Sequence, residues 1–167
     1  MKFFTVLFLI ATLSGCASTI PDDAPAYSPA PPSPDGSGTL YIFRMKTDRS
    51  TEWVPQIYVE RDMVTPLPAG AYTNIYLPEG KYRVRVVWPE KAYTPDLDFP
   101  IEVAAGEELY LSLKEQKRKV GALQKSKLRP ADLLYEYSNR AQFTEKKIAV
   151  LQLKECCRYL EPYPIYD

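Results

Sequence analysis

The chain has 167 residues, of which 21 are Lys or Arg, 21 are Asp or Glu and none is histidine. This length fits one domain with appendages, and a hydrophobic content of 46% is sufficient for a buried core. The formal net charge of zero argues against a general nucleic-acid binder, which is usually strongly basic. The lack of histidine excludes Ser-His-Asp and Cys-His nucleophile systems and the HExxH zinc helix. We therefore expect no metal, no other cofactor and no nucleic-acid partner.

Residues 1–15 are predicted to form a lipoprotein signal peptide. Lys2 precedes an apolar stretch, residues 3–13, in which two threonines are the only polar residues. This stretch is shorter than a bilayer-spanning helix of ~20 residues but fits the ~7–15 apolar residues of a secretory signal. Residues 13–16, with the sequence LSGC, resemble the lipobox of bacterial lipoproteins. The resemblance implies cleavage before Cys16, a diacylglyceryl thioether on Cys16 and an acylated amino terminus, whereas the alternative is an ordinary secretory signal that contains a cysteine.

Lipidation at Cys16 predicts where the protein is located. Two or more acyl chains hold a protein stably on a membrane, so a triacylated Cys16 is a permanent tether. Ala17 stands where an aspartate would favour retention in the inner membrane in enterobacteria-like sorting. The resemblance therefore implies a protein of the bacterial cell envelope, anchored by lipid in the outer membrane and facing the periplasm.

Residues 16–38 are predicted to be the lipidated cysteine and a proline-rich tether. Six prolines lie among small and polar residues between positions 17 and 38, with no apolar period to bury. Such a composition favours an extended polyproline II spacer. Residues 39–161 are then expected to form the folded domain, and residues 162–167 a tail.

Short segments with strand character fill residues 39–113. The segment 39–44 is rich in aromatic and β-branched residues, and the segment 81–86 alternates strictly between cations on one face and tyrosine or valine on the other. Similar segments are found at 57–59, 72–77, 109–113 and 131–137. Because proline and glycine turns separate them, the sequence predicts a mainly β protein, an antiparallel β-sandwich.

The C-terminal region is predicted to contain one short α-helix. Thr144 is a candidate N-cap and Glu145 places an acid in the first turn, which predicts a helix over residues 145–155. An edge strand is expected near 157–160, before prolines at 162 and 164 end regular structure.

Two segments resemble known β-sandwich modules. Residues 67–72, LPAGAY, and 77–86, LPEGKYRVRV, are similar to PEGA-type modules, in which a Pro-x-Gly turn leads into a lysine, a tyrosine and an alternating strand. Proline fixes φ at the first corner of such a turn, and glycine permits the positive φ that closes it. With the lipobox and the C-terminal helix, residues 39–160 resemble a family of bacterial lipoproteins described as a domain of unknown function. The resemblance implies a fold and no catalytic residues.

Residues 114–129 form a basic stretch between two predicted strands. Seven basic residues against one acid, Glu115, give it a net charge of +6, and Gly121 near its middle predicts a protruding hairpin. Each cation near an anionic surface contributes ~1 kcal/mol, so the stretch is a candidate contact for anionic lipid, lipopolysaccharide phosphates or an acidic protein; a solvated loop is the alternative. The candidate binding surface consists of Lys117, Arg118, Lys119, Lys125, Lys127 and Arg129.

Two cysteines, Cys156 and Cys157, are adjacent near the end of the predicted helix. Consecutive Cα atoms lie ~3.8 Å apart, below the usual disulfide range of ~4.4–6.8 Å, so a bridge between them would be strained. We expect one cysteine in the core at the end of the helix and the other beside it. A redox switch, a soft-metal site and an intermolecular disulfide are the alternatives.

Tyrosines are abundant near the C-terminus. Three of the 13 tyrosines, Tyr159, Tyr163 and Tyr166, lie in the last nine residues. Exposed tyrosine rings can stack on glycans, although most tyrosines are expected to pack in strands.

The acidic residues are candidates for a hydrolytic site, because a glycosidase needs only two carboxylates. Asp96, Asp98, Glu107 and Glu108 lie near prolines or a glycine and are interpreted as turn residues. The sequence therefore predicts a non-enzymatic, lipid-anchored envelope protein that acts as a binding or scaffolding module. Its partners are the membrane, through the lipid, and an envelope protein, anionic lipid or glycan. An accessory subunit of a secretion or efflux assembly is the alternative, and a hydrolase of envelope polymers is less favoured.

Overall fold

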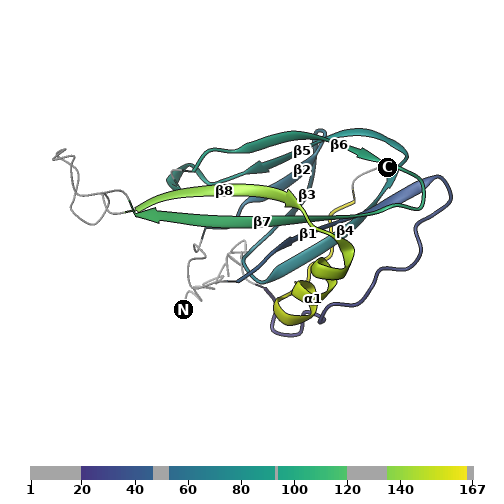
Figure 1. Ribbon diagram of the computed structural model, residues 1–167, viewed down its shortest axis with the longest axis horizontal. Helices are drawn as coiled ribbons and strands as arrows, with labels where there is room; N and C mark the ends of the chain where they lie inside the picture. Colours follow the sequence, from purple (N-terminus) through teal and green to yellow (C-terminus); the bar gives the residue numbers. More distant parts are fainter. Residues whose placement is uncertain (1–19, 47–52, 93, 120–134, 165–167) are drawn as a thin grey trace, which may run out of the picture.

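The computed structural model describes residues 20–46, 53–92, 94–119 and 135–164. These residues form two β-sheets that pack face to face, with one short helix near the C-terminus (Figure 1). The predicted mainly β fold with a C-terminal helix is confirmed. The predicted signal peptide and Cys16 lie outside the described residues. The elements in chain order are β1 (Ser37–Arg44), β2 (Gln56–Val59), β3 (Asp62–Pro66), β4 (Ala71–Pro78), β5 (Gly80–Val87), the 3₁₀-helix η1 (Glu90–Ala92), β6 (Leu97–Val103), β7 (Glu108–Lys119), β8 (Tyr135–Phe143), α1 (Lys146–Cys156) and β9 (Arg158–Tyr159).

The two sheets differ in how their strands pair. The five-stranded sheet has the order β8-β7-β1-β4-β9, and the four-stranded sheet has the order β3-β2-β5-β6. The pairing is not antiparallel throughout, as the sequence had predicted, since β1 runs parallel to β7 and β4 runs parallel to β9. A tight hairpin makes neighbouring strands antiparallel, but β1 and β7 are joined through strands of both sheets and are free of this constraint. The five-stranded sheet is therefore mixed.

Strand β1 is buried on both faces. Leu40 and Ile42 belong to the core between the two sheets, whereas Tyr41 and Phe43 belong to a second cluster that includes residues of α1. Because successive side chains of a strand point to opposite faces, the uninterrupted apolar segment of β1 contributes to both layers. This explains why β1 does not alternate between polar and apolar residues as β5 does.

The two edge strands of the four-stranded sheet, β3 and β6, were not predicted from the sequence. Strand β6 contains Pro100, which lacks a backbone N–H and is tolerated only where one side of a strand has no partner. The segments predicted at 57–59, 72–77, 81–86 and 109–113 correspond to β2, β4, β5 and β7. Strand β8 overlaps the segment predicted at 131–137, of which residues 131–134 lie outside the described residues.

Residues 20–36, the described part of the proline-rich segment before β1, pack on the domain. A free spacer would make no such contacts. The ring of Tyr27 lies 5.4 Å from the ring of Tyr72, and the hydroxyl of Tyr76 donates a hydrogen bond to the carbonyl of Pro31 at 3.0 Å. Tyrosine supplies both an apolar ring and a hydroxyl, which can bind the backbone groups that an irregular segment leaves unpaired. Residues 20–36 are therefore part of the surface of the domain.

Helix α1 begins one residue later than predicted. Glu145 occupies the N-cap position without a side-chain hydrogen bond, so the predicted Thr144 cap is wrong. The backbone N–H of Thr144 donates instead to the carbonyl of Tyr110 at 2.8 Å, which holds Thr144 beside β7 before the helix begins. The edge strand expected near 157–160 is confirmed as β9. Within the described ranges, no helix combines the length and hydropathy needed to cross a membrane.

Gly38 of β1 approaches the turn between β6 and β7. A Cβ atom at this position would lie 2.6 Å from the carbonyl oxygen of Ala104 and 3.0 Å from that of Glu107. Because backbone oxygens cannot move aside like the end of a flexible side chain, Gly38→Ala is expected to lower the free energy of unfolding by about 1–3 kcal/mol, as overpacking does. Urea unfolding measures this, with Ser37→Ala as the control, expected to change stability by under about 0.5 kcal/mol. Equal losses in both variants would contradict the explanation.

Candidate binding surfaces

The β7–β8 hairpin carries the first three cations of the candidate binding surface. Lys117, Arg118 and Lys119 are the last three residues of β7. Their register partners in β8 are Tyr137, Glu136 and Tyr135. The hairpin extends beyond the other strands of both sheets (Figure 1). The remaining predicted cations, Lys125, Lys127 and Arg129, lie outside the described residues, so binding by this surface stays a prediction.

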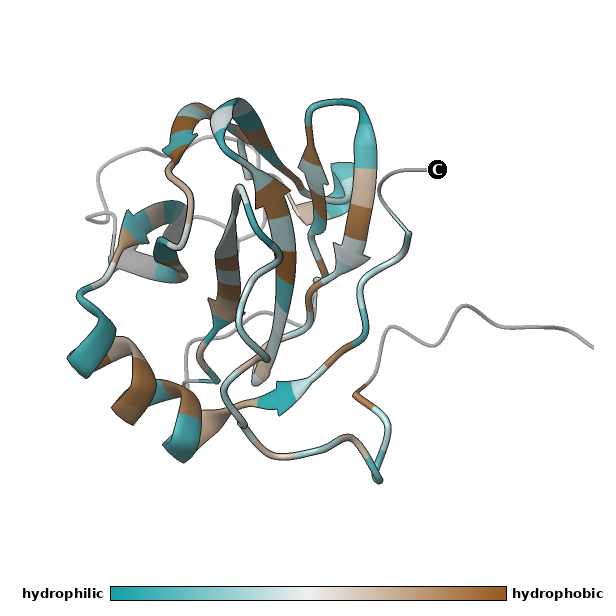
Figure 2. Ribbon diagram, turned by 90° about the vertical axis from the view of Figure 1, so that its right-hand side faces the viewer, coloured by the Kyte–Doolittle hydropathy of each residue, from teal (hydrophilic) through white to brown (hydrophobic). Residues whose placement is uncertain are grey.

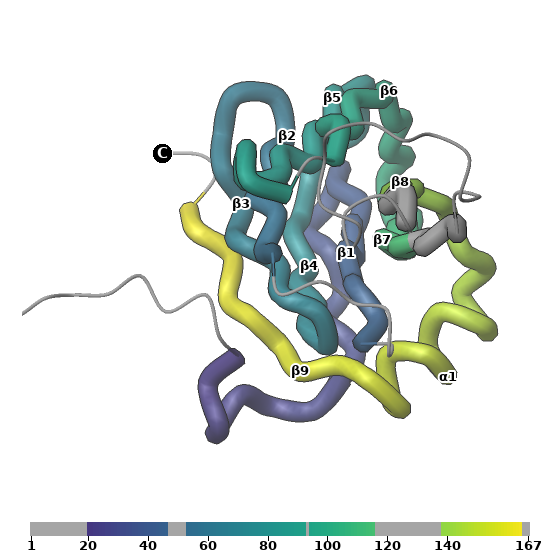
Figure 3. Tube along the Cα trace, turned by 90° about the vertical axis from the view of Figure 1, so that its left-hand side faces the viewer, coloured from purple at the N-terminus to yellow at the C-terminus, as the bar shows by residue number. Residues whose placement is uncertain are grey.

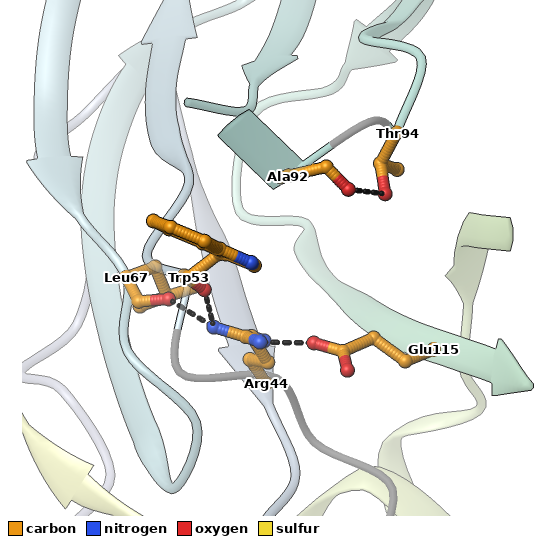
Figure 4. Close-up of polar contacts among 6 residues, drawn as sticks. All are labelled: Arg44, Trp53, Leu67, Ala92, Thr94 and Glu115. Carbon is orange, nitrogen blue, oxygen red and sulfur yellow. Dashed lines mark hydrogen bonds and ion pairs between the residues drawn. The ribbon is translucent and has the colours of Figure 1, made fainter. Parts of the chain in front are cut away.

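Arg44, the last residue of β1, holds the base of this hairpin from inside the domain (Figure 4). Arg44 is only 2% exposed, and its guanidinium forms an ion pair with Glu115 of β7, whose side chain is 7% exposed. Its Nη1 also donates hydrogen bonds to the carbonyl oxygens of Trp53 and Leu67, at 2.9 and 3.4 Å. The guanidinium carbon lies 5.0 Å from the ring centroid of Trp88. The hairpin is thus fixed to the core by a buried charge pair.

This pair was not predicted from the sequence. Burial lowers the pKa of Arg44, and the Glu115 carboxylate acts in the opposite direction. An arginine nevertheless keeps its charge in a protein, so a carboxylate partner is needed in the core. The only signal in the sequence was a charged residue at the end of the apolar segment 39–44. Because Glu115 is paired inside the domain, it does not offset the cations farther along the hairpin.

Glu108 joins the first turn of α1 to β7. Its Oε2 accepts a hydrogen bond from the Tyr110 hydroxyl at 2.8 Å and lies 2.5 Å from Nζ of Lys146. Burial by itself raises the pKa of Glu108, but the hydrogen bonds from Lys146 and Tyr110 outweigh burial, so the pKa lies below its ordinary value. These contacts hold the start of the helix against the five-stranded sheet.

The outer side of α1 presents apolar side chains to solvent. Ile148 is 49% exposed and Leu151 is 57% exposed, although Leu153 is fully buried on the other side of the helix. Hydrophobic segments accordingly alternate with hydrophilic ones along the helix (Figure 2). Lys147, Val150 and Leu151 contribute to an open hollow of about 570 Å³ beside it.

Cys156 and Cys157 form a vicinal disulfide, with Cα atoms 3.7 Å apart. The bridge that the short Cα separation disfavoured is therefore present. The backbone changes from helical to extended at Cys157, where φ is −123° and ψ is 143°. Cys157 lies in the core cluster under α1 and Cys156 lies beside that cluster, as expected.

The carboxylates that are candidates for a hydrolytic site have separate local partners. Asp96 and Glu107 each accept a hydrogen bond from a backbone N–H, at 2.8 and 2.9 Å. Asp98 lies 2.5 Å from Nε of Arg83 on an exposed surface. In the described part of the chain, no group of three or more His, Cys, Asp or Glu residues is placed to hold a metal.

Several described tyrosines are packing residues. The rings of Tyr41 and Tyr110 stack with centroids 4.6 Å apart, and the ring of Tyr72 lies 5.4 Å from that of Tyr159. Tyr163 differs, because its side chain is 47% exposed. Tyr166 lies outside the described residues.

No protein-family model, no curated protein and no solved structure matches the chain. The similarity of residues 67–72 and 77–86 to PEGA-type modules, and of residues 39–160 to a family of bacterial lipoproteins, therefore stays a prediction from the sequence. The function proposed next rests on the chain's own residues.

Proposed function

We propose that the chain is a lipid-anchored protein of the bacterial envelope whose β-sandwich is a non-enzymatic binding module. Cys16 carries the lipid that holds the protein in the outer membrane, and the β7–β8 hairpin contacts an anionic surface. The observation that supports this proposal best is the position of Lys117, Arg118 and Lys119 at the end of a long paired hairpin.

Charge and geometry favour a contact role for the hairpin. Residues 116–139 contain six basic residues and two acidic ones, and the acid nearest to the base of the hairpin, Glu115, is paired with Arg44 in the core. Each cation near an anionic surface contributes ~1 kcal/mol. Anchoring by lipid keeps the domain at the membrane, which raises its effective concentration toward other envelope components.

Neutralising the described hairpin cations is expected to weaken binding to an anionic membrane. The triple variant Lys117→Gln, Arg118→Gln, Lys119→Gln loses three cations, which corresponds to about a 100-fold lower affinity at low salt. The lipidated protein is reconstituted in neutral nanodiscs, so that its acyl chains are already embedded, and the nanodiscs are co-sedimented with anionic phospholipid vesicles at low and high salt. High salt is expected to remove most of the difference, because it screens exposed charges.

A matched control removes three exposed cations from the other sheet and its adjoining turns. The variant Arg61→Gln, Lys81→Gln, Lys91→Gln changes the net charge of the protein by the same amount and is expected to bind the vesicles nearly as well as the wild type. Equal loss in the two triple variants would mean that overall charge, and not the hairpin, governs binding. Wild-type binding by the hairpin variant at low salt would contradict the proposed contact.

A further inference from the structure

An open groove lies between residues 74–76 of β4 and the C-terminal segment, which comprises residues 159–164. Strand β9 pairs with β4 only at the first two residues of β4. Pro162 then follows, and its missing N–H prevents the pairing from continuing. The segment crosses instead to β3, where the backbone N–H of Tyr163 donates to the carbonyl of Val64 at 2.7 Å (Figure 3). The divergence leaves a groove between the segment and β4, at the edge of the five-stranded sheet opposite β8.

The groove has the size and lining of a small-molecule site. Its volume is about 400 Å³, within the range of about 300–1,000 Å³ that is typical of ligand sites. One isoleucine and two prolines contribute to its apolar lining. The side chains with aromatic or polar groups in the lining are Asn74, Tyr76, Tyr159, Glu161 and Tyr163.

Two of the three tyrosines are held in place before any ligand binds. The hydroxyl of Tyr76 is hydrogen-bonded to the carbonyl of Pro31 at 3.0 Å, and the ring of Tyr159 packs on the ring of Tyr72. Burial raises the pKa of Tyr159, and Glu161 and the neighbouring tyrosines raise it further, so its hydroxyl stays a neutral hydrogen-bond donor. Tyr163 completes the groove from the C-terminal segment with its ring about half exposed.

We infer that this groove binds a neutral carbohydrate. Tyrosine rings offer flat apolar faces for the C–H faces of sugar rings, whereas the amide of Asn74 and the carboxylate of Glu161 offer acceptors and donors for hydroxyl groups. The lining contains no basic residue, and Glu161 repels an anionic ligand. A wholly apolar ligand would cover the amide of Asn74 without a hydrogen-bond partner, which is unfavourable. The inference does not depend on the hairpin function proposed above.

Calorimetry with defined oligosaccharides tests this inference on the full lipidated chain. The protein is held in a polyoxyethylene detergent, which has no sugar head group, and titrated with chitohexaose and cellohexaose, which are neutral, and with hexagalacturonate, which is anionic. At least one neutral hexamer is expected to bind, and hexagalacturonate is expected to bind more weakly. Tyr163→Ala is expected to weaken binding of the neutral hexamer about tenfold, as loss of an aromatic contact in a binding site does. Tyr163→Phe, which keeps the ring, is expected to bind like the wild type.

Two controls separate the groove from other effects. Tyr58→Ala removes a half-buried ring from β2 in the other sheet and is expected to leave oligosaccharide binding unchanged. The hairpin variant Lys117→Gln, Arg118→Gln, Lys119→Gln is also expected to leave it unchanged, so failure of one proposal is distinguishable from failure of the other. The inference is overturned if neither neutral hexamer binds, if hexagalacturonate binds best, or if Tyr163→Ala binds like the wild type.

Discussion

Replacing Glu115 by leucine is expected to lower the free energy of unfolding by about 3–5 kcal/mol, the usual cost of removing one partner of a buried ion pair. The substitution leaves the Arg44 guanidinium in the core without the carboxylate that now pairs with it. The carbonyl groups of Trp53 and Leu67 continue to accept hydrogen bonds from Arg44, but they carry no full negative charge. Urea unfolding of the purified variant measures the loss.

A double variant separates the burial of charge from a simple loss of contact. Arg44→Met combined with Glu115→Leu removes both charges and is expected to be more stable than Glu115→Leu alone, because apolar residues often replace a buried pair with little loss. The exposed pair Arg83–Asp98, with side chains 61% and 42% exposed, supplies the control, and Asp98→Leu is expected to cost about 0–1 kcal/mol. If the single and double variants were equally unstable, the unpaired charge would not be the cause.

Cys16→Ala is expected to abolish lipid attachment and to release the protein from the membrane fraction. Each buried methylene of an acyl chain contributes ~0.8 kcal/mol to membrane binding. One chain anchors a protein only marginally, whereas two or more hold it stably. Cells grown with a labelled fatty acid provide the readout, in which the wild-type protein carries the label and the variant does not. Fractionation of the same cells shows whether the variant leaves the membrane.

The other two cysteines provide the matched control for this experiment. The chain has three cysteines, and Cys156 and Cys157 are joined to each other at the end of α1. Cys156→Ala and Cys157→Ala are therefore expected to keep both the label and the membrane location. A labelled, membrane-bound Cys16→Ala protein would contradict the predicted anchor.

Elements with a strong local pattern were predicted well, and those whose pattern is interrupted were missed. The alternation at 81–86 predicted β5, since its period of two reflects a strand with one buried face. Pro100 concealed β6, because a proline argues against a strand unless the strand is known to lie at an edge. Thr144 looked like a helix cap, but its backbone is held by Tyr110, a residue 34 positions earlier in the chain.

The candidate surfaces divide in the same way. The basic stretch was found because its charges are consecutive in the sequence. The groove beside β4 was predicted only in part. Tyr159 and Tyr163 were candidates for stacking on glycans, but Asn74 and Tyr76, which line the same groove from β4, were not. No spacing in the sequence connects these residues, because the groove exists only where the C-terminal segment leaves β4.

The sequence by itself determined the mainly β class, most strand positions, the C-terminal helix and the basic hairpin stretch. Each of these depends on residues that are neighbours in the chain, and periodicity, turn residues and runs of charge report on such neighbours. Only the tertiary structure decided the parallel pairing of β1 with β7, the Arg44–Glu115 pair across 71 positions and the groove beside β4. These features depend on which strands become adjacent. Strands become adjacent because the apolar faces of the whole chain are buried together, and no local pattern in the sequence encodes that arrangement.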